Sequence, residues 1–182
     1  MSGKLIVVSG PSGVGKSSVV RWIKNNNSDV WVSVSMTTRE KRPDEEEGRE
    51  YFFVTRDVFQ ETVDSGQMLE WAEFAGNLYG TPAGPVRQKV AEGVHVILEI
   101  ELQGARQVRQ LFPDAILVFL MPPSWQALVE RLTGRGTETQ EVIERRLEVA
   151  KIELAAESEF DISLTNFEVE TTARELLDFA RS

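Results

Sequence analysis

The sequence predicts an α/β fold of the P-loop NTPase type, in which helices flank a parallel sheet. Three continuous apolar runs, at 5–8, 94–100 and 115–121, are typical of strands buried on both faces, as in parallel sheets. Segments with helical patterning separate these runs, which favours an α/β arrangement. Positions 10–17 fit the pattern G-x-x-x-x-G-K-[ST] between the first run and a helix, the context in which that pattern forms a phosphate-binding loop.

The remaining elements follow in chain order from local signals. Three asparagines at 25–27 end the first helix, and two prolines at 122–123 end the strand before them. Ser124 comes next and is placed to cap a helix, because its hydroxyl can accept a backbone N–H of the first turn. The predicted strands are 5–8, 31–34, 94–100, 115–121 and 161–165, and the predicted helices are 16–24, 105–111, 125–133, 141–157 and 171–179.

The region 36–85 departs from the regular pattern. It begins with a charged stretch that has almost no apolar residues and continues with short aromatic segments broken by glycines. We expect an inserted subdomain here rather than a regular strand–helix–strand unit.

The composition excludes several classes of function. A net charge of −9 over 182 residues argues against a generic nucleic-acid binder. There is no cysteine, hence no disulfide and no thiolate chemistry. No apolar run approaches the ~18 residues of a membrane span, and a strand follows so soon after Met1 that we expect no signal peptide and a cytoplasmic location. The single histidine, His95, lies in an apolar run and is expected to be a packed strand residue.

The loop 10–17 predicts binding of a nucleoside triphosphate, most simply ATP. Its glycines let the backbone curl so that N–H groups point at phosphate oxygens. Lys16 would reach the β- and γ-phosphates, the Ser17 hydroxyl would bind Mg²⁺, and the helix that starts near Lys16 adds the positive end of its dipole. A GTPase, an ATPase and a kinase all use such a loop, so the motif alone leaves the reaction open.

The charged stretch 37–49 offers a second anion site. Arg39, Lys41 and Arg42 crowd together in an otherwise acidic protein, which is unfavourable unless an anion joins them. The alternative is a solvated loop whose basic residues are balanced by Asp44 and the three glutamates at 45–47. The loop by itself does not decide between the two.

The chain resembles the guanylate kinases, which phosphorylate GMP with ATP. The resemblance runs from about Leu5 to the C-terminus, and its order and spacing are specific. The matching segments are 10–18, 33–39 with Arg42, 48–53, 69–74, 77–82, 98–105, Arg131, 134–138, 145–147 and Asn166. The resemblance implies ATP contacts from Gly10, Pro11, Ser12, Gly13, Val14, Gly15, Lys16, Ser17, Ser18, Arg135 and Asn166.

For the acceptor, the resemblance implies that Arg39, Arg42, Tyr51 and Tyr79 hold the GMP phosphate. Two guanidinium groups and two phenol hydroxyls suit a dianion, although core packing is the plain alternative for the tyrosines. Glu70 would face the guanine edge, with Ser35 and Thr81 beside it. Guanine presents adjacent N1–H and N2–H₂ donors that a carboxylate can accept, whereas adenine would present an acceptor. For Trp71 we expect ordinary core packing.

Two acidic residues stand at the end of the predicted strand 94–100, on the side where ligands bind in open α/β sheets. The resemblance implies that Glu99 and Glu101 contact the acceptor site, the P-loop lysine and Mg²⁺-bound water. Glu101 stands where the family usually has Asp, which keeps the charge but adds a methylene. Leu78 stands where Tyr is frequent, and Phe167 where Asp is frequent, which leaves the adenine contacts beside Asn166 undefined.

The segment 124–150 would be a small helical lid, leaving 1–35, 86–123 and 151–182 as the core of a single domain. Arg131, Arg135 and Arg146 surround its Gly-flanked break and, with Lys16 and Arg39, would neutralise charge during phosphoryl transfer. Pairing with glutamates on a helix surface is the plain alternative for these arginines, and we accept it for Arg145.

The resemblance implies direct in-line transfer from ATP to GMP, and to dGMP, with Mg²⁺. Guanylate-kinase-like domains also serve as protein-binding modules, but a pure scaffold has no need for Lys16, Arg39 and Glu70 together. A nucleoside monophosphate kinase for another base is the second alternative, against which Glu70 argues. The expected partners are small molecules, without nucleic acid or membrane, and the sequence gives no oligomeric state.

Overall fold

The computed structural model describes residues 3–74, 76–134 and 140–182 and is built around a five-stranded sheet in the order β2-β7-β1-β8-β9. Every pair of neighbours in this sheet is parallel, as the continuous apolar runs predicted. The strands are β1 (Leu5–Ser9), β2 (Val30–Val32), β7 (His95–Glu99), β8 (Ile116–Met121) and β9 (Ile162–Thr165).

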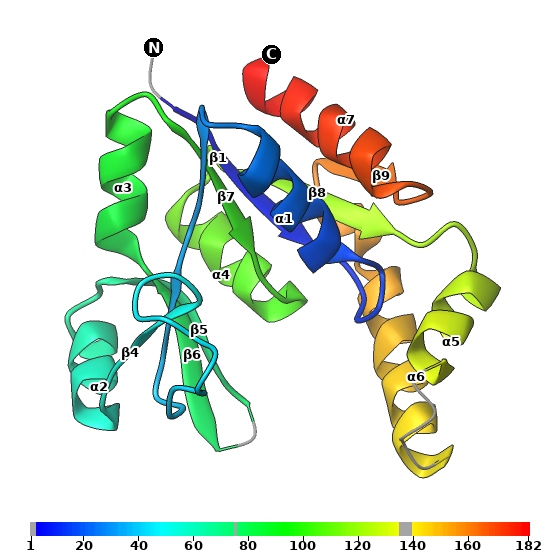
Figure 1. Ribbon diagram of the computed structural model, residues 1–182, viewed down its shortest axis with the longest axis horizontal. Coiled ribbons are helices and arrows are strands. Elements are labelled where there is room, and N and C mark those ends of the chain that lie inside the picture. Colours follow the sequence, from blue (N-terminus) through cyan, green and yellow to red (C-terminus); the bar gives the residue numbers. More distant parts are fainter. Residues whose placement is uncertain (1–2, 75, 135–139) are drawn as a thin grey trace.

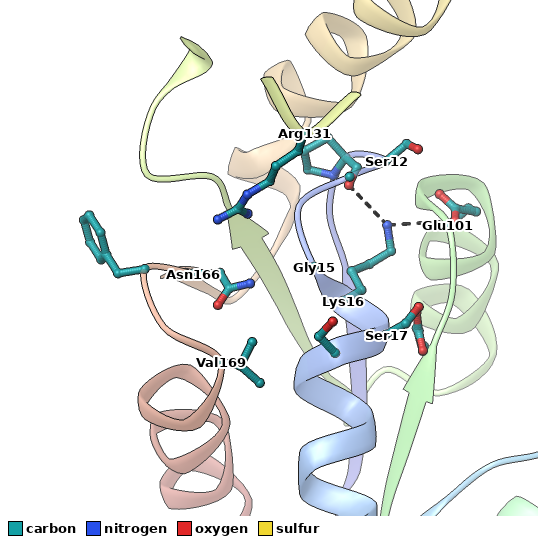
Figure 2. A pocket seen from close by; sticks show the side chains of 13 residues that line it. Ser12, Gly15, Lys16, Ser17, Glu101, Arg131, Asn166 and Val169 are labelled. Carbon is teal, nitrogen blue, oxygen red and sulfur yellow. Dashed lines mark hydrogen bonds and ion pairs between the residues drawn. The ribbon is translucent and has the colours of Figure 1, made fainter. Parts of the chain in front are cut away.

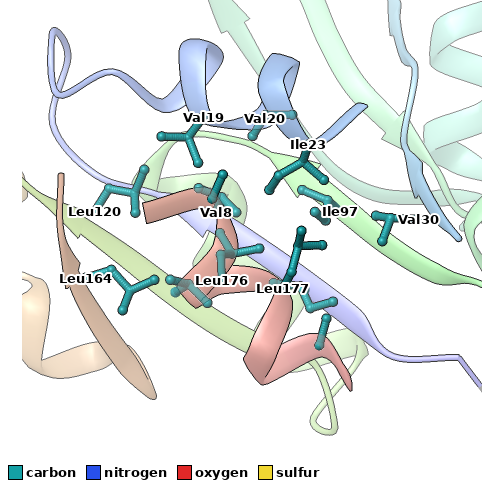
Figure 3. Close-up of a cluster of buried hydrophobic side chains, with 14 of the residues drawn as sticks. Val8, Val19, Val20, Ile23, Val30, Ile97, Leu120, Leu164, Leu176 and Leu177 are labelled. Atoms are coloured by element: carbon teal, nitrogen blue, oxygen red, sulfur yellow. The ribbon is translucent and has the colours of Figure 1, made fainter. Parts of the chain in front are cut away.

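Alternate residues of the sheet face two separate apolar layers. Ile6 and Val8 of β1 pack with helices α1 (Lys16–Asn26) and α7 (Val169–Arg181), in the cluster drawn in Figure 3. Leu5 and Val7 face the opposite way, toward α3 (Ala83–Ala91) and α4 (Leu102–Leu111). Strands of a sheet that is covered on both faces are apolar at nearly every position, and β1 is accordingly buried from end to end, with Ser9 as its one polar residue.

The inserted region forms a second sheet of four short strands in the order β4-β3-β6-β5. It pairs β3 (Ser35–Thr37) in parallel with β4 (Tyr51–Phe53) and antiparallel with β6 (Asn77–Pro82), which also pairs with β5 (Met68–Phe74). Helix α2 (Arg56–Asp64) covers it through a small core of Phe59, Met68 and Leu78. Strands β3 and β4 have only three residues each, too few for a periodic pattern. The sequence therefore indicated an insert but not its sheet.

The predicted strand 31–34 is wrong at its end, because residues 33–34 connect the two sheets and belong to neither strand. β2 stops at Val32, and β3 begins at Ser35 in the other sheet. The backbone N–H of Ser33 still donates to Ile97 O in the first sheet, at 2.9 Å. The chain therefore passes from the core to the insert within two residues, which alternation of apolar residues alone does not reveal.

Two helices follow the carboxyl end of β8 (Ile116–Met121). Ser124 caps α5 (Trp125–Thr133) as predicted, because its Oγ accepts the backbone N–H of Ala127 at 3.1 Å. Helix α6 (Gln140–Ala155) packs on α5 through Leu128, Leu132 and Ala150 and leads to a short 3₁₀ turn, Glu157–Glu159. In Figure 1 the insert and the α5–α6 pair flank the end of the sheet at which β1 enters α1.

None of the helices in the described part of the chain combines the length and the apolar character that a bilayer crossing requires.

Candidate active site

The loop between β1 and α1 is curled by glycines that no other residue could replace without strain. Gly10, Gly13 and Gly15 have φ angles of 145°, 81° and 101°, all in the region that L side chains rarely adopt. A Cβ at Gly10 would lie 2.5 Å from Leu120 O, and one at Gly15 would lie 2.5 Å from Asn166 Nδ2. The curl and the close packing around it together set the shape of the loop.

Lys16, the first residue of α1, folds back over this loop. Its Nζ donates to Gly10 O at 2.6 Å and lies 3.9 Å from Glu101 Oε1. The residue is only 8% exposed, more buried than a phosphate-binding lysine on a surface loop would be. Its ammonium is nevertheless surrounded by oxygen atoms rather than by an apolar cluster. It is therefore positioned to exchange these oxygens for those of a phosphate.

Ser17 and Glu99 bring hard oxygen atoms together beside the lysine. The Ser17 hydroxyl donates to Glu99 Oε1 at 2.5 Å, and Glu99 is the last residue of β7. Among the described residues, no group of three or more His, Cys, Asp or Glu side chains could hold a metal ion by itself. A hydroxyl and one carboxylate suit Mg²⁺, which keeps several waters and completes its shell with substrate phosphates.

These side chains line a cavity of about 510 Å³ at the carboxyl end of the sheet, shown in Figure 2. Lys16 and Glu101 lie on one side of it, and Arg131 and Asn166 lie on the other. The ends of β1, β7 and β9 and the start of α7 all contribute to its wall. It is lined by Pro11, Ser12, Gly13, Gly15, Lys16, Ser17, Ser18, Glu99, Glu101, Arg131, Asn166, Phe167 and Val169.

The carbonyl of Val14 joins the loop to two other parts of the molecule. Arg131 of α5 donates to it at 3.0 Å, and the side-chain amide of Asn166 donates to it at 2.9 Å. The Asn166 Oδ1 in turn accepts a hydrogen bond from the Thr172 hydroxyl at 3.2 Å. Asn166 is 4% exposed, and both ends of its amide serve to hold the loop against α7.

Helix α6 reaches the same loop with one basic and one acidic side chain. Arg146 Nη2 donates to Ser12 Oγ at 3.4 Å, and the Ser12 backbone N–H donates to Glu153 Oε2 at 3.2 Å. Burial raises the pKa of the Glu153 carboxyl above its ordinary value, and the hydrogen bond from Ser12 opposes that shift. Sequence reasoning missed Glu153, because a glutamate on an amphipathic helix resembles any solvated residue.

The arginines predicted for the lid have different outcomes. Arg131 and Arg146 both lie against the phosphate-binding loop. Arg145 pairs on the helix surface with Glu141, at 3.1 Å, which confirms its plain interpretation. Arg135 lies outside the described residues.

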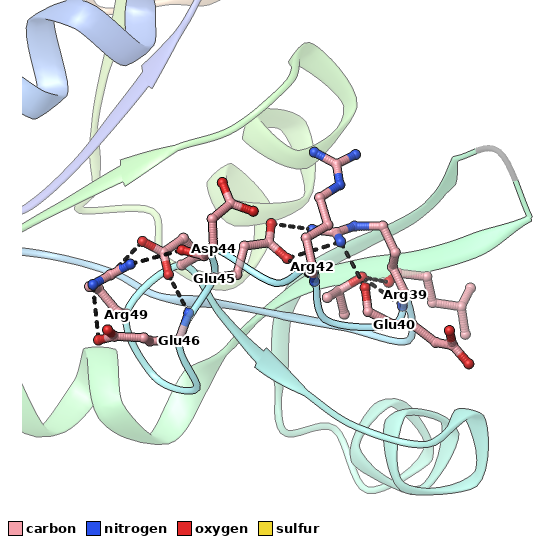
Figure 4. A network of polar contacts seen from close by, with 10 residues as sticks. Arg39, Glu40, Arg42, Asp44, Glu45, Glu46 and Arg49 are labelled. Carbon is pink, nitrogen blue, oxygen red and sulfur yellow. Dashed lines mark hydrogen bonds and ion pairs between the residues drawn. The ribbon is translucent and has the colours of Figure 1, made fainter.

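The basic loop before β4 carries a compact ion pair, drawn in Figure 4. Arg39 Nη2 and Nη1 donate to the Glu45 carboxylate at 2.6 and 3.0 Å. Arg42 joins through its backbone, whose N–H donates to Glu45 Oε2 at 2.9 Å. The loop is thus neither a free cationic patch nor a uniformly solvated one, and Glu45 is a second residue that sequence reasoning missed.

Two tyrosines meet beside Arg39. The rings of Tyr51 and Tyr79 pack edge to face with centroids 5.9 Å apart, and the Arg39 guanidinium lies 5.5 Å from the Tyr51 centroid. Burial raises the pKa of the Tyr51 hydroxyl, and the neighbouring Tyr79 adds to that shift. The Tyr51 hydroxyl therefore remains a neutral hydrogen-bond donor. Ser35, which the resemblance assigns to the base, is paired with Tyr51 across β3 and β4, so it lies next to the predicted phosphate-side residues.

Glu70 is a buried carboxylate in the middle of the insert. It is 8% exposed, and its Oε1 accepts the Thr81 hydroxyl at 2.6 Å. Burial raises the pKa of the Glu70 carboxyl, and hydrogen bonds from the Thr81 hydroxyl and backbone N–H oppose the rise. A carboxylate taken out of water at this cost is more typical of a binding site than of a structural role.

Helix α4 of the core holds the strand that carries Glu70. A Cβ on Gly104 would lie 2.8 Å from Glu70 Oε2, so only glycine leaves room for the carboxylate there. The side-chain amide of Gln107 makes two hydrogen bonds to the backbone of Trp71. It accepts from the Trp71 backbone N–H and donates to the Trp71 carbonyl, each at 3.0 Å. We expected Trp71 to be a core residue, and its ring does pack on the Phe59 ring. However, Trp71 is 37% exposed, so it is not buried as a core residue would be.

The parallel sheet and its glycine-curled loop define the chain as a P-loop nucleotide-binding α/β protein. The family model described as guanylate kinase matches residues 2–182. The chain belongs to the guanylate kinase family.

Similar proteins match over nearly the full chain. The guanylate kinases of Streptomyces kasugaensis and Thermobifida fusca are each 59% identical over 174 residues, which is 96% of this chain and 85% and 89% of theirs. The crystal structure of guanylate kinase from Anaplasma phagocytophilum is 31% identical, with a TM-score of 0.77, and covers 99% of this chain and 85% of that one.

The fold also occurs in a more distant setting. The SH3-kinase fragment of tight junction protein 3 has a TM-score of 0.51 and 13% identity, covering 99% of this chain and 57% of that chain. At this identity the similarity concerns the fold alone.

The Asn166 bridge generates a test of stability. Replacing Asn166 with Ala leaves the buried Val14 carbonyl short of one donor and removes the nearer of the two acceptors of the Thr172 hydroxyl, so we expect a loss of about 1–3 kcal/mol of unfolding free energy. Urea unfolding followed by circular dichroism measures it. Asn26→Ala is the control, because it removes an exposed hydrogen bond from the side-chain amide of Asn26 to Trp22 O. Its unfolding free energy is expected within about 0.5 kcal/mol of the parent. Equal effects of the two substitutions would contradict the bridge.

Proposed function

We propose that this protein transfers the terminal phosphoryl group of ATP to GMP, giving ADP and GDP. The observation that carries the proposal is Glu70, a buried carboxylate in an insert that lies toward the same end of the sheet as a complete phosphate-binding loop (Figure 1). Membership of the guanylate kinase family supports the same reaction. We include dGMP as an acceptor, because none of the groups that we assign to the acceptor addresses a ribose 2′-hydroxyl.

On the donor side, the triphosphate would lie in the 510 Å³ cavity against the loop from Gly10 to Ser18. Lys16 would leave the carbonyls of Gly10 and Pro11, to which it now donates, for the β- and γ-phosphates. The side-chain amide of Asn166 is already hydrogen-bonded to Val14 and Thr172, so we propose that Asn166 shapes the site. The adenine base would then contact Phe167 and Val169, which also line the cavity.

Mg²⁺, when bound with ATP, would offset phosphate charge and fix the β- and γ-oxygens for transfer. We propose that Ser17 holds it directly and that Glu99 or Glu101 does so through water.

On the acceptor side, the phosphate would bind Arg39, Arg42 and the hydroxyls of Tyr51 and Tyr79. The base would lie against Glu70, with Ser35 and Thr81 at its edge. The Thr81 hydroxyl already donates to Glu70 Oε1, which fixes the carboxylate plane and leaves its other lone pairs for guanine N–H donors. A base with an acceptor at that position would face a buried carboxylate, which is the strong form of discrimination.

Transfer itself needs no general base, because the oxygen of an ionised GMP phosphate is already nucleophilic. The chain's contribution would be alignment and positive charge around the moving group, from Lys16, Arg39, Arg131, Arg135 and Arg146. We propose that the core, the insert 36–85 and the lid 124–150 act as three parts that close around both nucleotides and exclude water.

Two other functions are weighed against this proposal. A protein-binding module with this fold would not require Lys16, Ser17 and a buried Glu70 to be retained together. A kinase for another base would gain nothing from a carboxylate in the place of Glu70. The deciding experiment measures ADP formation from ATP with GMP, AMP, CMP, UMP and dTMP in turn. We expect turnover with GMP to exceed the others by orders of magnitude, and comparable rates with AMP would refute the assignment.

The first prediction from this function concerns the donor site. Lys16→Ala should lower kcat by several orders of magnitude, because it removes the side-chain cation of the phosphate-binding loop, while the protein still folds. Lys24→Ala is the control, since Lys24 lies exposed in the last turn of the same helix. Steady-state rates and a thermal melt of each variant measure the two effects. A Lys16→Ala enzyme that keeps most of its turnover would contradict the assignment.

The second prediction concerns the base. Glu70→Gln puts an amide donor against a guanine donor, so kcat/KM for GMP should fall by roughly 2–4 kcal/mol of transition-state binding. AMP should be affected little, because its N1 acceptor then finds an amide donor. The GMP-to-AMP ratio of kcat/KM in the two proteins is the measurement. An unchanged ratio would show that Glu70 does not recognise the base.

The same residue predicts a pH dependence. Burial raises the pKa of Glu70 above its ordinary 4.5, and only the ionised form accepts both guanine donors. The kcat/KM for GMP should therefore fall as pH decreases, starting at a higher pH than an ordinary glutamate would give. Because the GMP phosphate also titrates, the quantity to measure is the ratio of parent to Glu70→Gln across pH. A ratio that is flat with pH would contradict this role.

A further inference from the structure

The Arg39–Glu45 pair uses one particular edge of the guanidinium group. Nη1 and Nη2, the two terminal nitrogens, donate to the two oxygens of one carboxylate at 3.0 and 2.6 Å. Nη1 also donates to Glu40 O at 2.8 Å, which uses its second hydrogen. Glu45 therefore grips the guanidinium end-on (Figure 4).

A guanidinium group has five N–H donors in one plane and two edges that can hold an anion bidentately. The second, or side, edge is made of Nε–H and the other hydrogen of Nη2, and the Tyr79 side chain also interacts with this guanidinium. The faces of the group are not donors, and the rings of Tyr51 and Phe53 lie 5.5 and 5.8 Å from its centre. The orientation of the side edge is thus set by whatever holds the end edge.

Glu45 is itself held firmly. Its Oε2 accepts the Arg42 backbone N–H at 2.9 Å, and its own N–H donates to Arg42 O at 3.1 Å, which closes a turn. The Glu45 side chain is 10% exposed, whereas that of Glu46 is 67% exposed. Hydrogen bonds from Arg39 and then from the Arg42 backbone lower the pKa of the Glu45 carboxyl to about 2, so it stays ionised throughout the physiological range.

We propose that Glu45 is a positioning residue for the acceptor phosphate, which holds Arg39 end-on so that its Nε–Nη2 edge is presented to the phosphate of GMP. The inference rests on the proposed function in one respect, that Arg39 binds this phosphate. The proposal assigns a role to Glu45, an acidic residue whose own negative charge would repel the substrate.

The opposite role is that Glu45 competes with the phosphate for Arg39. The geometry favours positioning, because the carboxylate occupies one edge of the guanidinium and leaves the donors of the second edge to other partners. Competition would also move the carboxylate away from the Arg42 backbone N–H, which donates to its Oε2 at 2.9 Å. The two roles predict changes of opposite sign in the affinity for GMP.

Glu45→Gln tests the inference, because it keeps the shape of the side chain and removes its charge and one acceptor. We expect KM and the calorimetric Kd for GMP to rise about tenfold or more, with a much smaller change in kcat and an unchanged Kd for ATP. Glu45→Asp keeps the charge on a shorter arm and should recover part of the loss. Glu46→Gln is the matched control, since it makes the same charge change one residue away and breaks a pair with Arg49 instead.

A second arm separates positioning from simple loop stability. In an Arg39→Ala background, Glu45→Gln should change the Kd for GMP very little, because the group through which it acts is gone. A tighter Kd for GMP in Glu45→Gln would overturn the inference in favour of competition. Equal effects of Glu45→Gln and Glu46→Gln, or additive effects with Arg39→Ala, would overturn it too. A parent protein that binds GMP but does not phosphorylate it would refute the proposed function and leave this inference standing.

Discussion

The curl of the backbone between β1 and α1 is the constraint on which the rest of the site depends. Positive φ angles at Gly10, Gly13 and Gly15 turn the chain back on itself within a few residues. That turn brings Lys16 over the Gly10 carbonyl and exposes the Val14 carbonyl to Arg131 and Asn166. A single distorted loop thereby fixes the donor pocket and also attaches helices α5 and α7 to it.

The insert solves a different problem, which is to keep one carboxylate dry and correctly oriented. Burying Glu70 costs free energy that its two hydrogen bonds from Thr81 offset only in part, as its raised pKa indicates. Strand β5, which carries Glu70, is held against helix α4 of the core by hydrogen bonds from Gln107 and by close packing at Gly104.

Acidic side chains organise a protein that we propose handles anions. Glu45 holds Arg39, Glu99 holds the Ser17 hydroxyl, and Glu153 holds the backbone of Ser12. Each carboxylate accepts from a donor group whose partner would otherwise be water. The net charge of −9 is therefore compatible with two anionic substrates, because the cations are concentrated and oriented locally.

The sequence by itself determined the parts that short-range patterns encode. Apolar runs defined the buried parallel strands, Ser124 defined the start of α5, and the glycine spacing defined the loop with Lys16 and Ser17. Tertiary structure alone decided the roles of Glu45, Glu153 and Gln107 and the burial of Glu70. Glu153 contacts a residue 141 positions away, and Gln107 contacts one 36 positions away. No local pattern distinguishes such a residue from a solvated one, because its role arises from what the fold brings against it.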